Sequence, residues 1–378
     1  MKQHLNEQAV RQLAGCLATA WPVFDTAAFI KCASSGLEQL ELKQRVEHIA
    51  DQLMNHLPGD FTRTAGIVIQ VADIWTSEAT DKPIWSSFAA WPLIDYAGQA
   101  GWHHPELAMD VLEYITVLFT AEFAMRPYLQ HQFDIVYPRI LLWTRHADPH
   151  VRRLASECIR PRLPWAGHLK SFQRDPEPVL KVLELLKDDV SVYVQKSVAN
   201  NLNDISKDNP DRVLALVRQW LPKATKQRRW IIRHGLRSLI KQGVPEVFKL
   251  LDYSPTIALQ SQLQLNKVQV SYGDSFEITL SLQSESMSAQ DLVIDYAVWH
   301  LKANGNHSRK VFKWKTMTLT AGQCLKISKT HAFKALSTRK YYPGPHLLEV
   351  FINGQVTSRA EIELRQDQAN GDQGKPCN

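Results

Sequence analysis

Cysteine is scarce in this chain of 378 residues, and its five copies are scattered. An odd number of cysteines without any C-x-x-C spacing excludes a disulfide scaffold and gives no support for a zinc site. The fourteen histidines form no recognisable metal-binding motif either. We therefore expect no metal site.

Long apolar runs are also missing. No stretch approaches the ~18 to 20 uninterrupted apolar residues that a membrane-spanning helix needs, and the first residues lack the apolar core of a signal peptide. The sequence therefore predicts a cytoplasmic protein without a membrane partner, and we expect it to be a monomer.

Acidic residues are absent from one long part of the chain, positions 212 to 245. Residues 139–241 hold 21 Lys and Arg against 10 Asp and Glu, a net charge of +11, whereas residues 1–138 hold 8 against 16, a net charge of −8. A segregated positive segment of this kind creates a local field that attracts a polyanion.

Two hydrophobic patterns divide the chain. Up to residue 252, apolar residues recur three and four positions apart, as in 37–53 and 107–123, which predicts helices. After Tyr253, short alternating runs and the turn pairs Asn304-Gly305 and Asn353-Gly354 predict about seven strands of an immunoglobulin-like sandwich. We expect a mainly α domain at 1–252, an all-β immunoglobulin-like domain at 258–366 and a disordered tail at 367–378.

Helices in the middle of the chain resemble one another. Residues 148–155 and 189–199 each begin with an acidic cap, followed by Val, polar or basic residues and small apolar residues, about forty residues apart. The apolar segment 178–186 supplies the other helix of a hairpin, and 225–251 is a diverged third copy. This period is typical of HEAT-like repeats, which stack into an α-solenoid with a concave binding surface.

The first two of these helices carry unusual polar faces. Arg153, Glu157 and Arg160 share one face, either as a solvated surface with intrahelical ion pairs or as part of a binding site. In the second helix, Asn200, Asn201 and Asn203 stand where helix propensity disfavours asparagine. They indicate either a fraying last turn or a polar surface packed against a ligand or a neighbouring helix.

The third helix carries the strongest signal for anion binding. Lys226, Arg229, Arg233 and Arg237 fall at i, i+3, i+7 and i+11, which predicts one continuous stripe. A phosphate backbone would relieve the repulsion between these cations, although a solvated face is the alternative. The predicted DNA-binding residues are Arg152, Arg153, Arg160, Arg162, Lys196, Lys226, Arg229, Arg233 and Arg237.

Two long motifs resemble the AlkC family of bacterial DNA alkylation-repair glycosylases, relatives of the AlkD type. They are residues 146–157, continuing through Arg160-Pro161-Arg162-Leu163-Pro164-Trp165, and residues 193–204. The resemblance covers most of residues 30–250 and implies HEAT-like repeats that wrap duplex DNA, with an immunoglobulin-like domain in some members. It further implies base excision repair of cationic lesions such as 3-methyladenine, without metal or cofactor and without base flipping.

Matched by motif position, the resemblance implies a catalytic group of Glu157, Trp165 and Asp204, with Glu122 in a weaker motif as a fourth member. Two positions depart from the family pattern. Cys158 stands where Gly is expected and bears on the position of the helix, and Gln195 stands where a basic residue is expected and removes one possible phosphate contact.

The chemistry of base removal agrees with carboxylates at such a site. Departure of the base builds oxocarbenium character on the sugar, which ionised carboxylates stabilise, and one of them can orient or deprotonate water. We expect Asp204 in this role, Glu157 and Glu122 assisting, and Trp165 packed against the sugar or the cationic base. The alternative is a non-catalytic HEAT-repeat adaptor or nucleic-acid-binding protein, in which the carboxylates are ordinary ion-pair partners.

Overall fold

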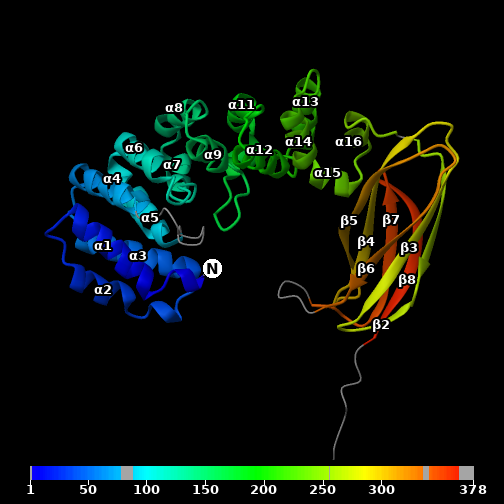
Figure 1. The fold of residues 1–378 in the computed structure, drawn as a ribbon, viewed down its shortest axis with the longest axis horizontal. Coiled ribbons are helices and arrows are strands. Elements are labelled where there is room, and N and C mark those ends of the chain that lie inside the picture. The colour runs from blue at the N-terminus through cyan, green and yellow to red at the C-terminus, as the bar shows by residue number, and fades with distance from the viewer. Residues whose placement is uncertain (1, 78–87, 255, 335–339, 366–378) are drawn as a thin grey trace, which may run out of the picture. The chain divides into compact units, whose positions relative to one another are not determined.

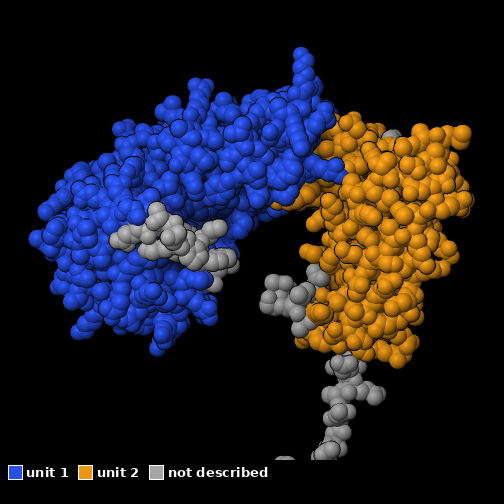
Figure 2. Space-filling model, viewed as in Figure 1, with its two compact units in different colours: residues 1–235 blue, residues 236–378 orange. Residues whose placement is uncertain are grey.

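The computed structural model describes residues 2–77, 88–254, 256–334 and 340–365. Close contacts divide the chain into two compact units, Met1–Gly235 and Leu236–Asn378 (Figure 2). Unit 1 is helical, and unit 2 combines two short helices with β-strands. The predicted tail at 367–378 lies outside the described residues.

The first half of unit 1 consists of amphipathic helices that bury an apolar stripe, as α6 does with Met109, Leu112 and Ile115. None of the described helices is long and apolar enough to cross a membrane. The helices are α1 (Glu7–Ala20), α2 (Thr26–Ser34), α3 (Leu42–His56), α4 (Phe61–Ser77), α5 (Trp91–Ala100), α6 (Pro105–Ile115), α7 (Met125–His131) and α8 (Phe133–Trp143).

Two of these helices are shorter than their apolar patterns predicted. The pattern at 37–53 is divided, because α3 begins only at Leu42, where Gln44 Oε1 accepts a hydrogen bond of 2.9 Å from the backbone N–H of Glu41. The pattern at 107–123 extends past the end of α6 at Ile115, and turns follow it up to α7. Glu122 therefore lies in a turn and not on a helix.

The second half of unit 1 confirms the prediction of HEAT-like helical hairpins. Figure 1 shows α8, α11 and α13 along one side of this part and α9, α12 and α14 along the other, with α12 in contact with both α9 and α14. The helices are α9 (Pro149–Glu157), α10 (Lys170–Arg174), α11 (Glu177–Leu186), α12 (Val192–Ile205), α13 (Pro210–Trp220) and α14 (Lys226–Gly235).

The predicted continuous stripe on the third helix is wrong at its last residue. α14 ends at Gly235, and Arg237 begins a separate short helix, α15 (Arg237–Gln242), which belongs to unit 2. Gly235 packs tightly on α12, since a Cβ at this position would lie 2.9 Å from Leu202 Cβ. The boundary between the two compact units lies after Gly235. It therefore comes before the change from helix to strand after residue 252, where the sequence predicts the domain boundary.

Unit 2 contains two antiparallel-rich sheets that face each other across an apolar core. One sheet has the strand order β1-β3-β6 and the other β2-β8-β7-β4-β5, with β2 parallel to β8. Large side chains such as Phe276, Tyr296 and Phe333 fill the core. The strands are β1 (Leu259–Leu265), β2 (Gln269–Ser271), β3 (Ser275–Ser284), β4 (Gln290–Leu301), β5 (His307–Leu319), β6 (Cys324–Ala332), β7 (Gly344–Ile352) and β8 (Gln355–Arg365).

The predicted turn at Asn353-Gly354 also holds the helices of unit 2 against the strands. Asn353 and Gly354 have φ of +48° and +81° between β7 and β8, as a two-residue hairpin requires. A Cβ at Gly354 would lie 2.5 Å from a ring carbon of Phe248 on α16 (Pro245–Leu250). Only glycine allows this approach, so α15 and α16 pack as part of the sandwich unit.

Candidate active site and DNA-binding surface

α9 and α12 lie side by side and supply two of the three predicted carboxylates. Asp148 caps α9 by accepting a hydrogen bond of 2.7 Å from the backbone N–H of His150. Val151 and Leu154 of α9 are buried in the core, as are Val198 and Leu202 of α12. The polar residues between these apolar positions meet at the contact of the two helices.

A row of alternating charges joins the three carboxylates. Arg153 Nη1 donates to Glu122 Oε2 at 2.9 Å, and its Nη2 lies 3.4 Å from Glu157 Oε1. Arg160 donates from Nη1 to Glu157 Oε1 at 2.7 Å and from Nε to Asp204 Oδ2 at 2.8 Å. None of these five side chains, which we call the ion row, is more than 12% exposed. Burial at this depth requires the pairing that the row provides.

α12 fixes the middle of the ion row through its polar side chains. The Ser197 hydroxyl donates to Glu157 Oε2 at 2.6 Å, and Asn201 Nδ2 donates to the Ser156 carbonyl at 2.8 Å. For Asn201, the second of the two predicted alternatives therefore holds: its side chain packs against a neighbouring helix, α9. The alternative of a solvated face around Glu157 is wrong, because this side chain is buried between α9 and α12.

The three carboxylates differ in how completely they are held. Both oxygens of Glu122 contact Arg153, and both oxygens of Glu157 contact Arg or Ser partners. Asp204 uses Oδ2 for Arg160, whereas among the described residues its Oδ1 contacts only Lys207 Nζ, at 3.2 Å. The Lys207 side chain is 40% exposed. Asp204 is therefore the member of the ion row whose second oxygen is most easily released.

Burial and pairing act differently on the two glutamates. Burial raises the pKa of Glu122, and the nearby Arg153 only partly opposes this effect. Burial also disfavours the charged form of Glu157, but Arg153 and Arg160 together outweigh it and hold the pKa of Glu157 below its usual value. Glu157 is thus kept ionised inside the protein, and Glu122 is the glutamate more readily protonated.

Trp165 lies in the connection between α9 and α10, residues 161–169, which we call the Trp165 turn. It is 55% exposed and has a φ of +65°, a conformation that costs a non-glycine residue roughly 1 kcal/mol or more. Lys43 Nζ donates to the Trp165 carbonyl at 2.9 Å. Arg126 donates from Nη1 to the carbonyls of Cys158 at 3.0 Å and Arg160 at 2.8 Å, and from Nη2 to that of Gly167. These two cations hold the turn in place.

Sequence reasoning missed both of these cations. Lys43 lies 122 positions from Trp165, so no local pattern connects them. The one available signal for Arg126 was an arginine inside the otherwise apolar stretch 124–129. A buried arginine in such a position needs acceptors, and here three backbone carbonyls supply them.

Four of the predicted DNA-binding arginines are engaged within the protein. Arg153 and Arg160 belong to the ion row. Arg152 Nε donates to Asp189 Oδ2 at 2.6 Å, and Arg162 Nε donates to Asp208 Oδ2 at 2.8 Å. These arginines connect segments that lie 37 and 46 positions apart in the sequence.

Of the other predicted cations, four are exposed and one is half-buried. Lys196 on α12 and Lys226 and Arg229 on α14 are exposed, and none of the three forms an ion pair within the described part of the chain. Arg233 on α14 is exposed as well, and Arg237 is half-buried on α15. Lys196, Lys226 and Arg229 therefore keep the capacity to bind phosphate.

The two departures from the family pattern are both buried. Cys158 forms the C-cap of α9 and is fully buried. Gln195 is 5% exposed, and its side-chain amide donates to the Asp189 carbonyl at 2.8 Å. The Gln195 side chain thus bonds within the protein, and the loss of a phosphate contact at this position stays a prediction.

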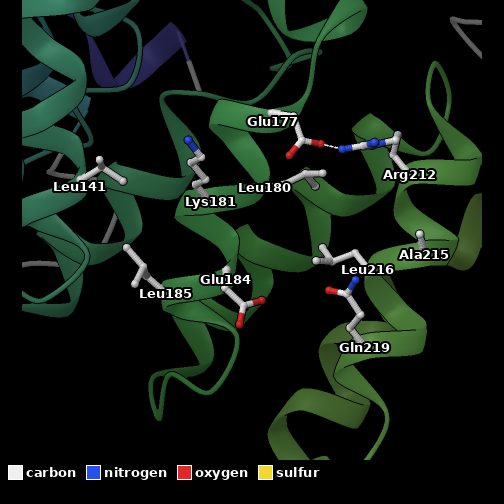
Figure 3. A pocket seen from close by; sticks show the side chains of 10 residues that line it. All are labelled: Leu141, Glu177, Leu180, Lys181, Glu184, Leu185, Arg212, Ala215, Leu216 and Gln219. Carbon is white, nitrogen blue, oxygen red and sulfur yellow. Dashed lines mark ion pairs between the residues drawn. The ribbon is translucent and has the colours of Figure 1, made fainter.

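One cavity of unit 1 is lined by none of the predicted site residues. This cavity, of about 600 Å³, lies between α11 and α13, where Glu177 pairs with Arg212 and Leu180 and Leu216 form apolar walls (Figure 3). Within the described residues, no group of three or more His, Cys, Asp or Glu side chains is arranged to hold a metal ion.

Comparisons with known proteins match both parts of the chain. Residues 108–239 match the family model described as DNA alkylation repair enzyme, and residues 260–366 match the C-terminal Ig-like domain model of the uncharacterised protein YhaZ. The protein YhaZ of Bacillus subtilis (strain 168) is 33% identical over 366 residues, which cover 96% of this chain and 99% of that protein.

A solved structure is similar over nearly the whole chain. It is that of the Pseudomonas fluorescens alkylpurine DNA glycosylase AlkC bound to DNA containing an abasic site analog. The sequence identity is 35%, the TM-score is 0.89, and the match covers 96% of this chain and 99% of the AlkC chain. At this identity and coverage, together with the match to the repair-enzyme model, the protein belongs to the AlkC family of DNA alkylation-repair proteins.

Proposed function

We propose that the protein is a DNA glycosylase of base excision repair that hydrolyses the N-glycosidic bond of cationic alkylated purines, such as 3-methyladenine, in duplex DNA. The observation that carries the proposal is the ion row, which holds three buried carboxylates on adjacent segments of unit 1. The similar AlkC of known structure is an alkylpurine DNA glycosylase, and its complex contains DNA with an abasic site analog.

The ion row suits a reaction that builds positive charge on the sugar. Ionised carboxylates that are fixed before the reaction stabilise an oxocarbenium ion without reorganising during the step. Arg153 and Arg160 keep the carboxylates in place and reduce the cost of burying them. The alkylated purine is a good leaving group because it already carries a positive charge, so no metal is needed to activate it.

Asp204 is the residue that we assign to the oxocarbenium ion and to the attacking water. Its Oδ1 contacts only an exposed lysine among the described residues, so Lys207 can move aside when substrate arrives. A carboxylate with one released oxygen can accept the proton of water while the other remains bound to Arg160. Glu157 and Glu122 assist by fixing the two arginines.

Trp165 is proposed to pack on the deoxyribose or on the cationic base. Its indole is exposed, and Lys43 and Arg126 hold the backbone of its turn. An aromatic face attracts a cation through its quadrupole. The further proposal that the lesion is removed without base flipping rests on the family resemblance alone.

DNA phosphates are proposed to contact Lys196, Lys226 and Arg229, which are exposed and have no ion-pair partner among the described residues. The four arginines that already pair with carboxylates are proposed to position the site instead. They are Arg152, Arg153, Arg160 and Arg162. Of the nine DNA-binding residues that the sequence predicts, this proposal thus keeps three as phosphate contacts.

The test is single-turnover release of 3-methyladenine from alkylated duplex DNA by the full chain. We expect Asp204→Asn to slow release by about 10²- to 10³-fold, the effect typical of removing one preorganised charge-stabilising group. Asp211→Asn makes the same chemical change at an exposed residue of α13 and should leave the rate unchanged.

Two results would contradict the proposal. Release by Asp204→Asn at the wild-type rate, with DNA affinity unchanged, would remove Asp204 from the reaction. Wild-type protein that binds duplex DNA but releases no base would favour the non-catalytic alternative, in which the ion row only stabilises the fold.

A further inference from the structure

A second cavity of unit 1, of about 730 Å³, lies between α3, α5 and the beginning of α7, next to the Trp165 turn. Its lining includes Lys43, Asp95, Trp102, Phe123 and Arg126, with Ala166 and Gly167 of the turn at one edge. This volume lies within the ~300 to 1,000 Å³ range of small-molecule sites in proteins. None of the residues assigned to catalysis lines it.

Asp95 supplies a carboxyl group in this cavity that no cation neutralises by direct contact. Its Oδ1 accepts a hydrogen bond of 3.1 Å from the indole N–H of Trp91, and no ion pair within the described residues involves it. Burial raises the pKa of Asp95 to about 7. A carboxyl group can accept hydrogen bonds when ionised, and when protonated it can donate one hydrogen bond while accepting another.

Two aromatic rings form apolar walls beside this carboxyl group. Trp102 and Phe123 are each only partly buried. Trp91 stacks on Phe123 with ring centroids 5.0 Å apart, and Tyr128 lies 5.3 Å from Trp102. Both rings are thus supported from within the protein, and a planar ligand could stack on them with little rearrangement.

One cation that lines the cavity is fixed by the protein itself. Arg126 is 6% exposed, and its Nη nitrogens donate to the backbone carbonyls of Cys158, Arg160 and Gly167. Lys43 and Arg126 line the cavity and also hold the Trp165 turn, so a ligand here would lie against the proposed active site.

We propose that this cavity binds a purine base that carries an exocyclic amino group, with the base stacked on Trp102 or Phe123 and its amino edge paired with Asp95. A carboxyl group can bond to such an edge at two points, because the edge places an N–H donor beside a ring nitrogen acceptor. The source of the base is either free base after excision or an undamaged base of the bound strand, because the lesion itself is proposed to react without base flipping. The first of these sources rests on the proposed function.

The first test is binding of free adenine to the full chain, measured by titration calorimetry. Asp95→Leu and Trp102→Ala should each weaken binding about tenfold or more, because each removes one side of the site. Asp95→Asn should bind within a few-fold of wild type, since an amide offers the same donor and acceptor pair. Asp51→Leu, at an exposed position of α3, is the matched control and should not change binding.

The second test uses 2-aminopurine placed in duplex DNA, with fluorescence quenching as the measure of stacking. Quenching that Trp102→Ala abolishes, without binding of free adenine, identifies a base of the strand as the ligand. Adenine binding without such quenching identifies free base. If neither signal depends on Asp95 or Trp102, in variants with unchanged circular dichroism, the proposal is wrong. Binding of adenine requires no catalysis. A failure of this proposal can therefore be distinguished from a failure of the proposed glycosylase function, which is measured by base release.

Discussion

The arginines near α9 and the cations of α14 show that positively charged side chains take two different roles within unit 1. Arg153 and Arg160 are buried beside Glu157 of α9, and each also pairs with a carboxylate from another segment of the chain. Lys226 and Arg229 stand exposed on α14 without an ion pair among the described residues. Net charge counts both groups equally, yet only the second keeps its charge available to a polyanion. Positive charge along a sequence therefore overestimates the number of phosphate contacts.

The largest expected effect comes from breaking the ion row in its centre. Arg160→Gln leaves Glu157 and Asp204 buried without their shared partner, and we expect the free energy of unfolding to fall by about 3 to 5 kcal/mol. Urea denaturation of the full chain measures this change.

The control for that variant is Arg162→Gln, which breaks a more exposed pair with Asp208. Such a pair contributes only about 0 to 1 kcal/mol, so the control should unfold close to wild type. Equal destabilisation by the two variants would show that burial does not distinguish the ion row from surface pairs.

A smaller effect should appear in the dependence of stability on pH. The pKa of Glu157 in the folded protein lies below its ordinary value of 4.5, so its contribution is fully present above about pH 4.5 and is lost as the pH falls through the folded value. Glu157→Gln should reduce the slope of unfolding free energy against pH below 4.5, by at most about 1.4 kcal/mol per pH unit for one proton.

Unfolding curves collected between pH 3 and pH 6 test this dependence. Glu38→Gln, at an exposed position before α3, should keep the wild-type slope. A Glu157→Gln variant with an unchanged slope would mean that this carboxylate gains no proton on acid unfolding, contrary to its pairing with two arginines.

The smallest effect is on DNA affinity, where the exposed cations should dominate. Arg229→Gln should reduce the slope of log affinity against log salt concentration by about 0.9, because one fewer counterion is released. Fluorescence anisotropy with unmodified duplex across a salt series measures the slope.

Arg212→Gln is the matched control for this measurement, since Arg212 pairs with Glu177 at the cavity between α11 and α13. We expect its salt slope to equal that of wild type. If Arg212→Gln lowered the slope and Arg229→Gln did not, the proposed phosphate-binding surface would be on the wrong side of the helical hairpins.

Local features of the chain were readable because they depend on neighbours in the sequence. The cap at Asp148, the hairpin turn at Asn353-Gly354 and the change from helical to alternating patterns near residue 252 each follow from a few adjacent residues. The helical hairpins and the sandwich were predicted on this basis. Where a local pattern continued past a break, as at 107–123 and at Leu236, the prediction was wrong.

The sequence alone therefore determined the two kinds of architecture, the family motifs and the excess of positive charge in the middle of the chain. Only the tertiary structure decided which charges pair, because Glu122, Arg153, Arg160 and Asp204 come together across separations of 31 and 44 positions. Helical periodicity predicts which residues share one face of a helix. It does not predict which segment of the chain packs against that face. The role of each arginine depends on that opposite segment, and so does the support of Trp165 by Lys43.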